Sequence, residues 1–280
     1  MKFCNENGCR IKVRYYRRFK YYGNYFMKLK CSFMVYLRTG LFFIMISIVS
    51  VAFLPVMFVG LLCSRNNYKV KYFIAKLYVK VFINLLKIIC GLNFQVKYDA
   101  KLPLGPAVVL SNHQSFWENV VVLLLFPMQS WVVKRELFNI PVFGWGLRLM
   151  DPVHVNRNDF WSVRKILTIG QQKIKDGLWM IMFPESARVP IDADKKFKPS
   201  GVKLASLSKV PIVLMTHNAG VFWPARSLLI KPGIIKIILG PVIEYKDYKM
   251  LAIRELNNLV ESLIVERKKL LLKNVITNSQ

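Results

Sequence analysis

An uncharged run of 24 residues, from residue 40 to residue 63, limits what this chain can fold into. It reads GLFFIMISIVSVAFLPVMFVGLLC and exceeds the roughly 20 apolar residues that an α-helix needs to cross a bilayer. The polar residues 64–67 (SRNN) follow it in place of a small-residue cleavage pattern, so we expect the run to be retained rather than removed as a signal peptide. Because Pro55 lies inside it, a kinked span and a re-entrant hairpin are the alternatives.

The chain combines a large positive charge with high hydrophobicity. Lys and Arg number 42 against 15 Asp and Glu, which gives a formal net charge of +27, while 54% of the residues are apolar. Soluble nucleic-acid-binding proteins seldom contain so much apolar sequence, whereas a protein on an anionic membrane gains roughly 1 kcal/mol of attraction per surface Lys or Arg. We therefore expect an anionic membrane surface as a partner, and no nucleic acid.

The chain ahead of the apolar run is basic and aromatic. Residues 1–33 show no helical or strand period, so we expect a disordered tail that touches lipid. An over-long start with Met34 as the true initiator, and RNA binding by this arm, are the alternatives. Residues 1–38 carry ten Lys or Arg and a single acid, Glu6, so a straight span would place this end in the cytoplasm. The far side of the run is basic too, so charge alone does not fix the orientation.

Residues 69–90 give a second membrane signal. Wound as a helix, this segment gathers lysines on one side and apolar residues over most of the rest; the lysines are Lys69, Lys76, Lys80 and Lys87. This pattern is typical of a helix in the membrane interface. The alternative is a helix that packs in the catalytic domain and exposes one stripe to solvent. We predict a tail at residues 1–33, a membrane anchor at 34–92 and a catalytic domain at 93–280.

After Gly91 the sequence changes to short apolar runs separated by turns and mixed segments. Strands are predicted at residues 107–110, 131–134, 179–183, 212–215 and 235–239, and helices at 118–125, 161–175, 201–207 and 250–272. Strands that alternate with helices predict an α/β domain in which helices flank a mixed sheet. The expected architecture is this domain behind an N-terminal membrane-anchoring helical segment.

The predicted strand at 107–110 runs directly into the sequence NHQSFWE, residues 112–118. A loop that leaves a strand end is where an α/β sheet presents reactive groups, and His113 lies in this loop. Glu118 follows in the next predicted helix. On one continuous helix the two side chains would point about 140° apart, so they meet only if His113 precedes the helix and folds back.

If the two side chains meet, they make a general base. A carboxylate that accepts from one imidazole nitrogen fixes the tautomer and raises the basicity of the other nitrogen, which then takes a proton from an attacking hydroxyl. The sequence holds no G-x-S-x-G nucleophile elbow, so the base would activate the alcohol of the substrate itself. The alternative for His113 is a capping or packing residue near a helix start.

From about residue 34 to residue 246 the chain resembles the bacterial 1-acyl-sn-glycerol-3-phosphate acyltransferases of the glycerolipid acyltransferase superfamily. Four blocks match in order: NHQSFWE at 112–118, KRELFNIPVFGWGLRLMDPVHVNR at 134–157, FPESAR at 183–188 and VPIVLMTHN at 210–218. In that family the first block is His, four residues and usually Asp. The resemblance therefore implies that His113 is the base and Glu118 its orienting acid.

The third block of the family usually reads Phe-Pro-Glu-Gly-Thr-Arg and contributes to binding the glycerol phosphate acceptor. The resemblance implies that Glu185 accepts from a glycerol hydroxyl and that Arg188 binds phosphate with two parallel hydrogen bonds. Ser186 and Ala187 stand where the family usually has Gly and Thr, and we expect Ser186 to be part of the substrate-binding site with Glu185 and Arg188. These departures bear on the acceptor more than on the reaction.

The second and fourth blocks offer fewer candidate site residues. The resemblance implies that Lys134, together with Arg157, lies near the substrate phosphate, and a solvated lysine at a strand end is the alternative for Lys134. The fourth block fits a buried strand, so we assign residues 210–215 to the fold. His217 follows just past the end of that strand, and we expect it to be a packing residue rather than a catalyst.

The residues and the resemblance together predict an acyltransferase of the EC 2.3.1 class that makes phosphatidic acid for phospholipid synthesis. It would move a fatty acyl group from acyl-CoA or acyl carrier protein to the free hydroxyl of 1-acyl-glycerol-3-phosphate. The same chemistry on a different lyso-lipid acceptor, and a non-catalytic membrane adaptor, are the alternatives. Because a thiolate leaves readily from a thioester, we expect no metal and no cofactor beyond this co-substrate.

The expected location is the inner (cytoplasmic) membrane, with the catalytic domain facing the cytoplasm. The five cysteines all precede residue 91 and form no metal-ligand pattern with the histidines. We therefore expect them to be reduced thiols, as in most cytoplasm-facing proteins.

Overall fold

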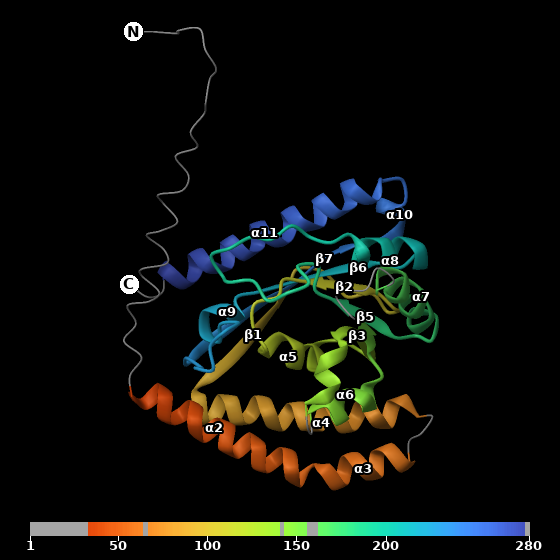
Figure 1. Ribbon diagram of the computed structural model, residues 1–280. Coiled ribbons are helices and arrows are strands. Elements are labelled where there is room, and N and C mark those ends of the chain that lie inside the picture. Colours follow the sequence, from red (N-terminus) through yellow and green to blue (C-terminus); the bar gives the residue numbers. More distant parts are fainter. Residues whose placement is uncertain (1–32, 64–66, 141–142, 156–161, 278–280) are drawn as a thin grey trace, which may run out of the picture.

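The computed structural model describes residues 33–63, 67–140, 143–155 and 162–277 (Figure 1). Residues 1–32 of the predicted tail lie outside these ranges, and so does Arg157. Within them the chain forms one mixed sheet with helices on both faces. The predicted α/β architecture is confirmed.

The sheet has seven strands in the order β1-β7-β6-β2-β5-β3-β4. In chain order they are β1 Leu92–Tyr98, β2 Val108–Ser111, β3 Gln129–Lys134, β4 Val153–Val155, β5 Trp179–Met182, β6 Ile212–His217 and β7 Gly233–Ile243. The five strands from β6 to β4 are parallel, β7 is antiparallel to β6, and β1 is parallel to β7. All five predicted strands are present, and β1 and β4 are additional.

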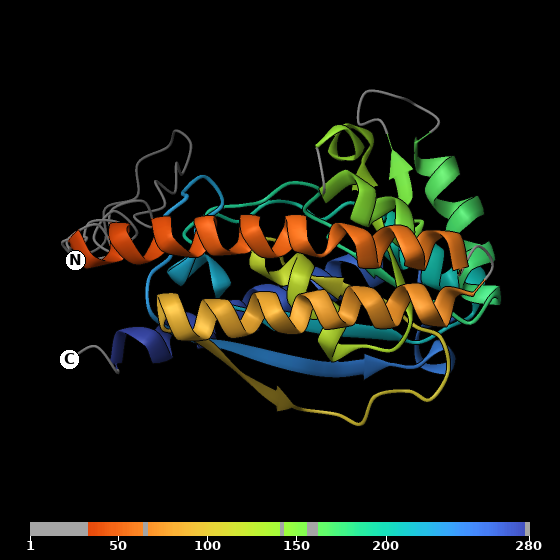
Figure 2. The ribbon, with the colours of Figure 1, turned by 90° about the horizontal axis from the view of Figure 1, so that it is seen from below.

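The helices cover both faces of the sheet (Figures 1 and 2). They are α2 Phe33–Ala52, α3 Leu54–Cys63, α4 Tyr68–Leu85, α5 Trp117–Leu125, α6 Phe143–Met150, α7 Ser162–Lys175, α8 Ser200–Ser208, α9 Ala219–Phe222, α10 Tyr245–Tyr248 and α11 Ile253–Thr277, with a π-helical turn η1 at Leu86–Cys90 and a 3-10 helix η2 at Arg135–Asn139. Helices α2 to α6 lie on one face, and α7, α8 and α11 lie on the other. The four predicted helices correspond to α5, α7, α8 and α11.

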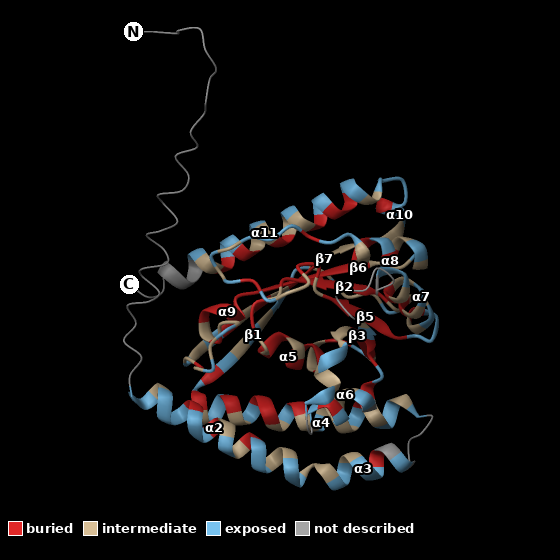
Figure 3. Ribbon diagram, in the orientation of Figure 1, coloured by how far each residue is buried: buried red, intermediate tan, exposed pale blue. Residues whose placement is uncertain are grey.

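Two hydrophobic cores lie on the two faces of the sheet, and the central strands contribute side chains to both. Val109 of β2 packs in the core beneath α4 and α5, while its neighbours Val108 and Leu110 pack in the core beneath α7, α8 and α11. Burial on both faces explains why these strands read as unbroken apolar runs rather than as alternating patterns. Figure 3 shows the buried centre of the sheet between the two helical layers.

The uncharged run at 40–63 does not form a single helix. Helix α2 begins earlier, at Phe33, and ends at Ala52, and α3 starts at Leu54. Pro55 has no N–H to donate to the carbonyl of Val51, which explains an interruption at this point. Of the helices in the described ranges, α2 alone is long and apolar enough to cross a membrane. The candidate span is therefore 33–52 rather than 40–63.

Helix α4 is built into the catalytic core. The hydroxyl of Tyr72 donates to the carbonyl of Phe126 at 2.7 Å, and Phe82 is buried in the core shared with α5. The core therefore crosses the predicted boundary at residue 92. On its inner side α4 packs in the catalytic domain, in agreement with the alternative of a domain helix that has one solvent-exposed stripe. The anchoring role of residues 34–92 stays a prediction. Cys90, at the end of the following turn, is a buried free thiol.

Candidate active site

Three neighbouring strands end at one edge of the sheet and bring distant segments together. Strands β6, β2 and β5 are adjacent and parallel, so the residues that follow their carboxyl ends meet at that edge. His113 follows β2, Glu185 follows β5, and His217 is the last residue of β6. The polar cluster described below lies where these three ends meet.

His113 and Glu118 are in direct contact. The Nδ1 atom of His113 lies 2.9 Å from Oε1 of Glu118. His113 sits in the loop between β2 and α5, while Glu118 is in the first turn of α5. The loop folds back over the helix start, as the spacing of the two residues required. Because Nδ1 is engaged with the carboxylate, Nε2 is the ring nitrogen that is left to accept a proton.

The carboxyl group of Glu118 is buried and strongly held. Its Oε1 also accepts from the N–H groups of Gln114 and Ser115, each at 2.7 Å. Burial by itself favours the neutral acid, but the hydrogen bond and charge of His113 and the Ser115 N–H oppose burial, and the pKa of Glu118 lies below its usual range. Glu118 is therefore ionised at neutral pH and suited to stabilise a positive charge on His113.

The His113 side chain is shielded but reachable. It is 13% exposed, whereas Glu118 is fully buried. The ring of Phe183 stacks on the imidazole with 4.3 Å between the centroids. The stacked ring restricts the rotation of the imidazole, and the remaining exposure lets a bound substrate reach it, as a general base requires.

Glu185 holds the main chain of His113. Its Oε2 accepts from the His113 N–H at 2.9 Å, and the side chain is buried. Burial raises the pKa of Glu185 to about 7. One of its oxygens is therefore engaged with the main-chain amide of His113, and the role of Glu185 as an acceptor for a glycerol hydroxyl stays a prediction.

His217 belongs to the same cluster, although sequence reasoning left it as a packing residue. It is fully buried, and its Nε2 lies 2.9 Å from the carbonyl oxygen of Asn112. The one signal in the sequence was its position at the end of an apolar strand. That signal could not identify the partner, because the partner lies 105 residues earlier in the chain.

Comparison with known proteins identifies the family. A family model described as "Acyltransferase" matches residues 93–217, which include His113, Glu118, Glu185 and His217. A 1-acyl-sn-glycerol-3-phosphate acyltransferase of Pseudomonas aeruginosa is 31% identical over 233 residues, which cover 82% of this chain and 90% of that protein. The chain belongs to the 1-acyl-sn-glycerol-3-phosphate acyltransferase family. The predicted resemblance is confirmed, and the protein is an acyltransferase enzyme.

Other relatives support the acyltransferase assignment. The chloroplastic 1-acyl-sn-glycerol-3-phosphate acyltransferase of Arabidopsis thaliana is 30% identical over 235 residues, which cover 80% of this chain and 64% of that protein. The crystal structure of the 1-acyl-sn-glycerophosphate acyltransferase from Thermotoga maritima matches the fold with a TM-score of 0.67. That match covers 84% of this chain and 95% of the other, with 20% sequence identity.

The acyltransferase block FPESAR forms a turn after β5. Ser186 has a φ of +57°, in the left-handed region that favours glycine, which explains why the family usually has Gly at this position. The Arg188 side chain is exposed, and one of its guanidinium nitrogens donates to the carbonyl of Ala225 at 3.4 Å. The guanidinium has five N–H donors, so donors remain for an anion.

Lys134 of the acyltransferase lies farther along the same edge. It ends β3, which is separated from β2 by β5, and its Nζ contacts Glu136 Oε1 at 3.1 Å. The structure therefore does not bring Lys134 into contact with His113 or Glu118. Arg157 follows β4 outside the described residues. Roles for both residues in phosphate binding stay predictions.

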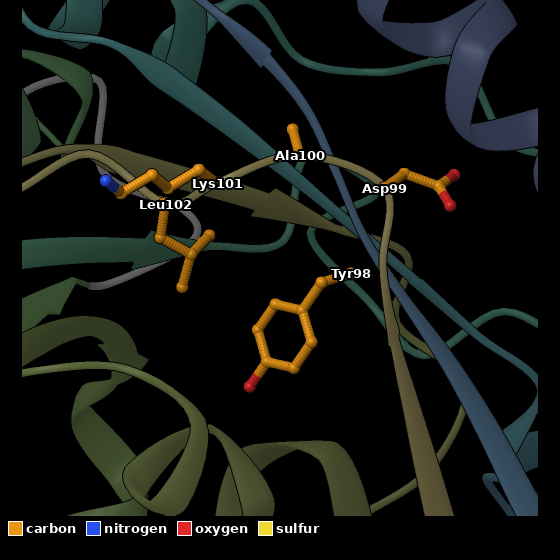
Figure 4. A pocket seen from close by; sticks show the side chains of 5 residues that line it. All are labelled: Tyr98, Asp99, Ala100, Lys101 and Leu102. Carbon is orange, nitrogen blue, oxygen red and sulfur yellow. The ribbon is translucent and has the colours of Figure 1, made fainter.

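A surface hollow lies away from this site. It is lined by residues 98–102, and Figure 4 shows the Tyr98 ring and the Leu102 side chain on one side of the segment and the Asp99 carboxylate on the other. The segment leaves β1, which is three strands from β2 in the sheet order, toward the opposite edge of the sheet. The hollow is therefore separate from the acyltransferase site.

Proposed function

We propose that this acyltransferase moves a fatty acyl group from a thioester donor to the free hydroxyl of 1-acyl-glycerol-3-phosphate and so makes phosphatidic acid. The observation that carries the proposal is the 2.9 Å contact between His113 and Glu118 at the sheet edge. It is supported by the 31% identity to the Pseudomonas aeruginosa enzyme, which is named for this activity.

The reaction follows from the geometry of the pair. Nε2 of His113 takes the proton of the acceptor hydroxyl, and the oxygen attacks the thioester carbonyl. The C–S bond breaks, a C–O ester bond forms, and the thiolate leaves with the proton that the imidazole releases. The ionised Glu118 stabilises the imidazolium while the proton resides on His113. Every group in this sequence comes from the protein, the donor or the acceptor, and we propose no metal or further cofactor.

The acceptor and the donor are both anionic, which suits the charge of the protein. Arg188 and Lys134 are the cations that we assign to the acceptor phosphate, with Arg157 as a third. The net charge of +27 attracts acyl-CoA and acidic acyl carrier protein alike, so donor choice is a matter for measurement.

We further propose that the enzyme acts at the cytoplasmic face of the inner membrane. Helix α2 packs on the catalytic domain through Thr39, Phe42 and Ile46, while its other side exposes apolar residues such as Ile44 at 60% and Val51 at 60%. A helix that packs on the domain through one side and is apolar on its outer side fits an anionic bilayer surface.

Acyl transfer from labelled acyl-CoA to lysophosphatidic acid tests the proposal. Wild-type protein in purified membranes should form phosphatidic acid, and His113→Ala should reduce the rate by about 1,000-fold or more because it removes the base. His154→Ala is the control for losing a histidine elsewhere and should keep wild-type activity. Acyl carrier protein thioesters and other lyso-lipids, offered in parallel, resolve the donor and the acceptor.

Each outcome has a definite meaning. Wild-type protein that is inactive with every thioester and lyso-lipid would leave the adaptor alternative in place of an enzyme. Activity that survives in His113→Ala would contradict the role of His113 while leaving the reaction standing. A strong preference for another lyso-lipid would change the assigned acceptor and leave the type of reaction unchanged.

A further inference from the structure

The peptide bond between Asn112 and His113 is held from both sides by buried side chains. On one side, the Asn112 carbonyl oxygen lies 2.9 Å from Nε2 of His217. On the other side, the His113 N–H donates to Oε2 of Glu185 at 2.9 Å. His217 ends β6 and Glu185 follows β5, and these two strands flank β2. The two contacts together form a clamp that spans three neighbouring strand ends.

The tautomer of His217 follows from its contacts. The N–H of Ala219 donates to Nδ1 at 3.3 Å, so Nδ1 is an acceptor and carries no proton. Nε2 faces a carbonyl oxygen and must therefore be the protonated nitrogen. Burial lowers the pKa of His217, so the ring stays neutral in this form.

The same two residues are joined a second time through the Asn112 side chain. Its Nδ2 donates to the His217 carbonyl at 2.9 Å, and its Oδ1 accepts from the His217 N–H at 3.0 Å. Three hydrogen bonds thus connect Asn112 to His217, and both residues are fully buried. Two of these bonds use the main chain of residue 217 and hold the two segments in register, so the Nε2 contact is the one that depends on the imidazole.

The clamp sets the direction in which the base projects. The plane of the peptide before His113 and the position of its Cα determine where the imidazole can reach. The Nδ1 contact with Glu118 at 2.9 Å tolerates little displacement. A misplacement of about 1 Å at a catalytic group can cost about 100-fold in rate.

We propose that His217 is a positioning residue for acyl transfer, which holds the Asn112 carbonyl so that His113 meets both Glu118 and the acceptor hydroxyl. The inference rests on the proposed role of His113 as the base. His217 acts through the main chain and does not touch the substrate, so its loss should lower kcat and leave substrate binding intact.

Two substitutions separate positioning from packing. His217→Gln keeps an N–H donor near the place of Nε2, whereas His217→Asn keeps polar atoms only near the place of Nδ1. The Asn112 carbonyl then loses the imidazole donor and keeps only the Ser111 hydroxyl, which donates to it at 3.1 Å. We expect His217→Asn to lower kcat by about 10- to 100-fold with both KM values within about twofold, and His217→Gln to stay within about threefold of wild type. Thr216→Val is the matched control, because this neighbouring hydroxyl is buried without a hydrogen-bond partner within the described ranges.

The tautomer of His217 can be measured in the wild-type protein, without any substitution. Nitrogen NMR of isotopically labelled wild-type enzyme in detergent should show His217 neutral and protonated at Nε2 from pH 6 to pH 8. A ring protonated at Nδ1, or at both nitrogens, would overturn the clamp even if His217→Asn failed to fold.

Three results of the kinetic measurements would count against the inference. Wild-type kcat in His217→Asn, equal losses in the Gln and Asn variants, or a raised KM with unchanged kcat would each overturn it. Wild-type enzyme that is active while His113→Ala retains activity would instead contradict the proposed base, which separates the two failures.

Discussion

Glu185 carries a buried carboxyl group, and burial raises its pKa to about 7. The folded protein therefore binds this proton more tightly than the unfolded chain does, and stability falls as the pH rises from about 4.5 to about 7. Glu185→Gln removes the charge and keeps an oxygen that accepts from the His113 N–H. We expect the variant to exceed wild type in unfolding free energy by about 1–3 kcal/mol at pH 8 and to match it near pH 4.5.

Denaturant unfolding of both proteins in detergent between pH 4.5 and pH 8.5 measures this difference. The exposed Glu266→Gln is the control and should keep the pH dependence of the wild type. A constant difference between Glu185→Gln and wild type across the range would show that the carboxyl does not titrate in the folded state near neutral pH.

At the scale of elements, α11 supports the loop that follows the FPESAR turn. Asn257 donates to the Phe197 carbonyl at 3.1 Å, Glu261 accepts from the Phe197 N–H at 3.1 Å, and Lys268 donates to the Ala193 carbonyl at 2.9 Å. These three side chains share one face of the helix, because they are spaced by four and seven residues. The helix lies beyond the residues that the family model matches.

Lys268→Met tests this support. The substitution keeps the length of the side chain and removes both its hydrogen bond to Ala193 and its ion pair with Asp194. We therefore expect amide hydrogen exchange across residues 189–199 to speed up by about tenfold. Lys269→Met is the matched control, since Lys269 is exposed on the next position of the same helix. Unchanged exchange in Lys268→Met, or an equal change in both variants, would mean that α11 does not stabilise the loop.

The sequence predicted elements with strong local patterns. Strands β2, β5 and β6 are buried on both faces and produced unbroken apolar runs. The predicted strands at β3 and β7 are present as well, while β4 has three residues and β1 is half exposed. The spacing of His113 and Glu118 showed that the two side chains meet only if His113 precedes the helix and folds back. The His217 contact with Asn112 depends on β6 lying beside β2, and the order of strands in a sheet has no local signal.

At the scale of the whole molecule, α2 joins a membrane-type exterior to the catalytic core. Phe42 is fully buried, and its ring lies 5.4 Å from that of Phe82 and 6.3 Å from that of Trp223 between centroids. Thr39 accepts from the N–H of Ile230 at 3.2 Å. On the outer side, Ile48 is 58% exposed. The two sides of one helix therefore differ in burial, and two single substitutions can test a separate role for each.

Phe42→Ala should lower the unfolding free energy in detergent by about 3–5 kcal/mol, because it opens a cavity between α2 and the catalytic domain. Ile48→Asn should change that free energy by less than about 0.5 kcal/mol, because the site is exposed, yet it should weaken sedimentation with anionic phospholipid vesicles. If Phe42→Ala were as stable as wild type, α2 would be an anchor separate from the fold. If Ile48→Asn bound vesicles as well as wild type, the outer face of α2 would not be the surface that meets the membrane.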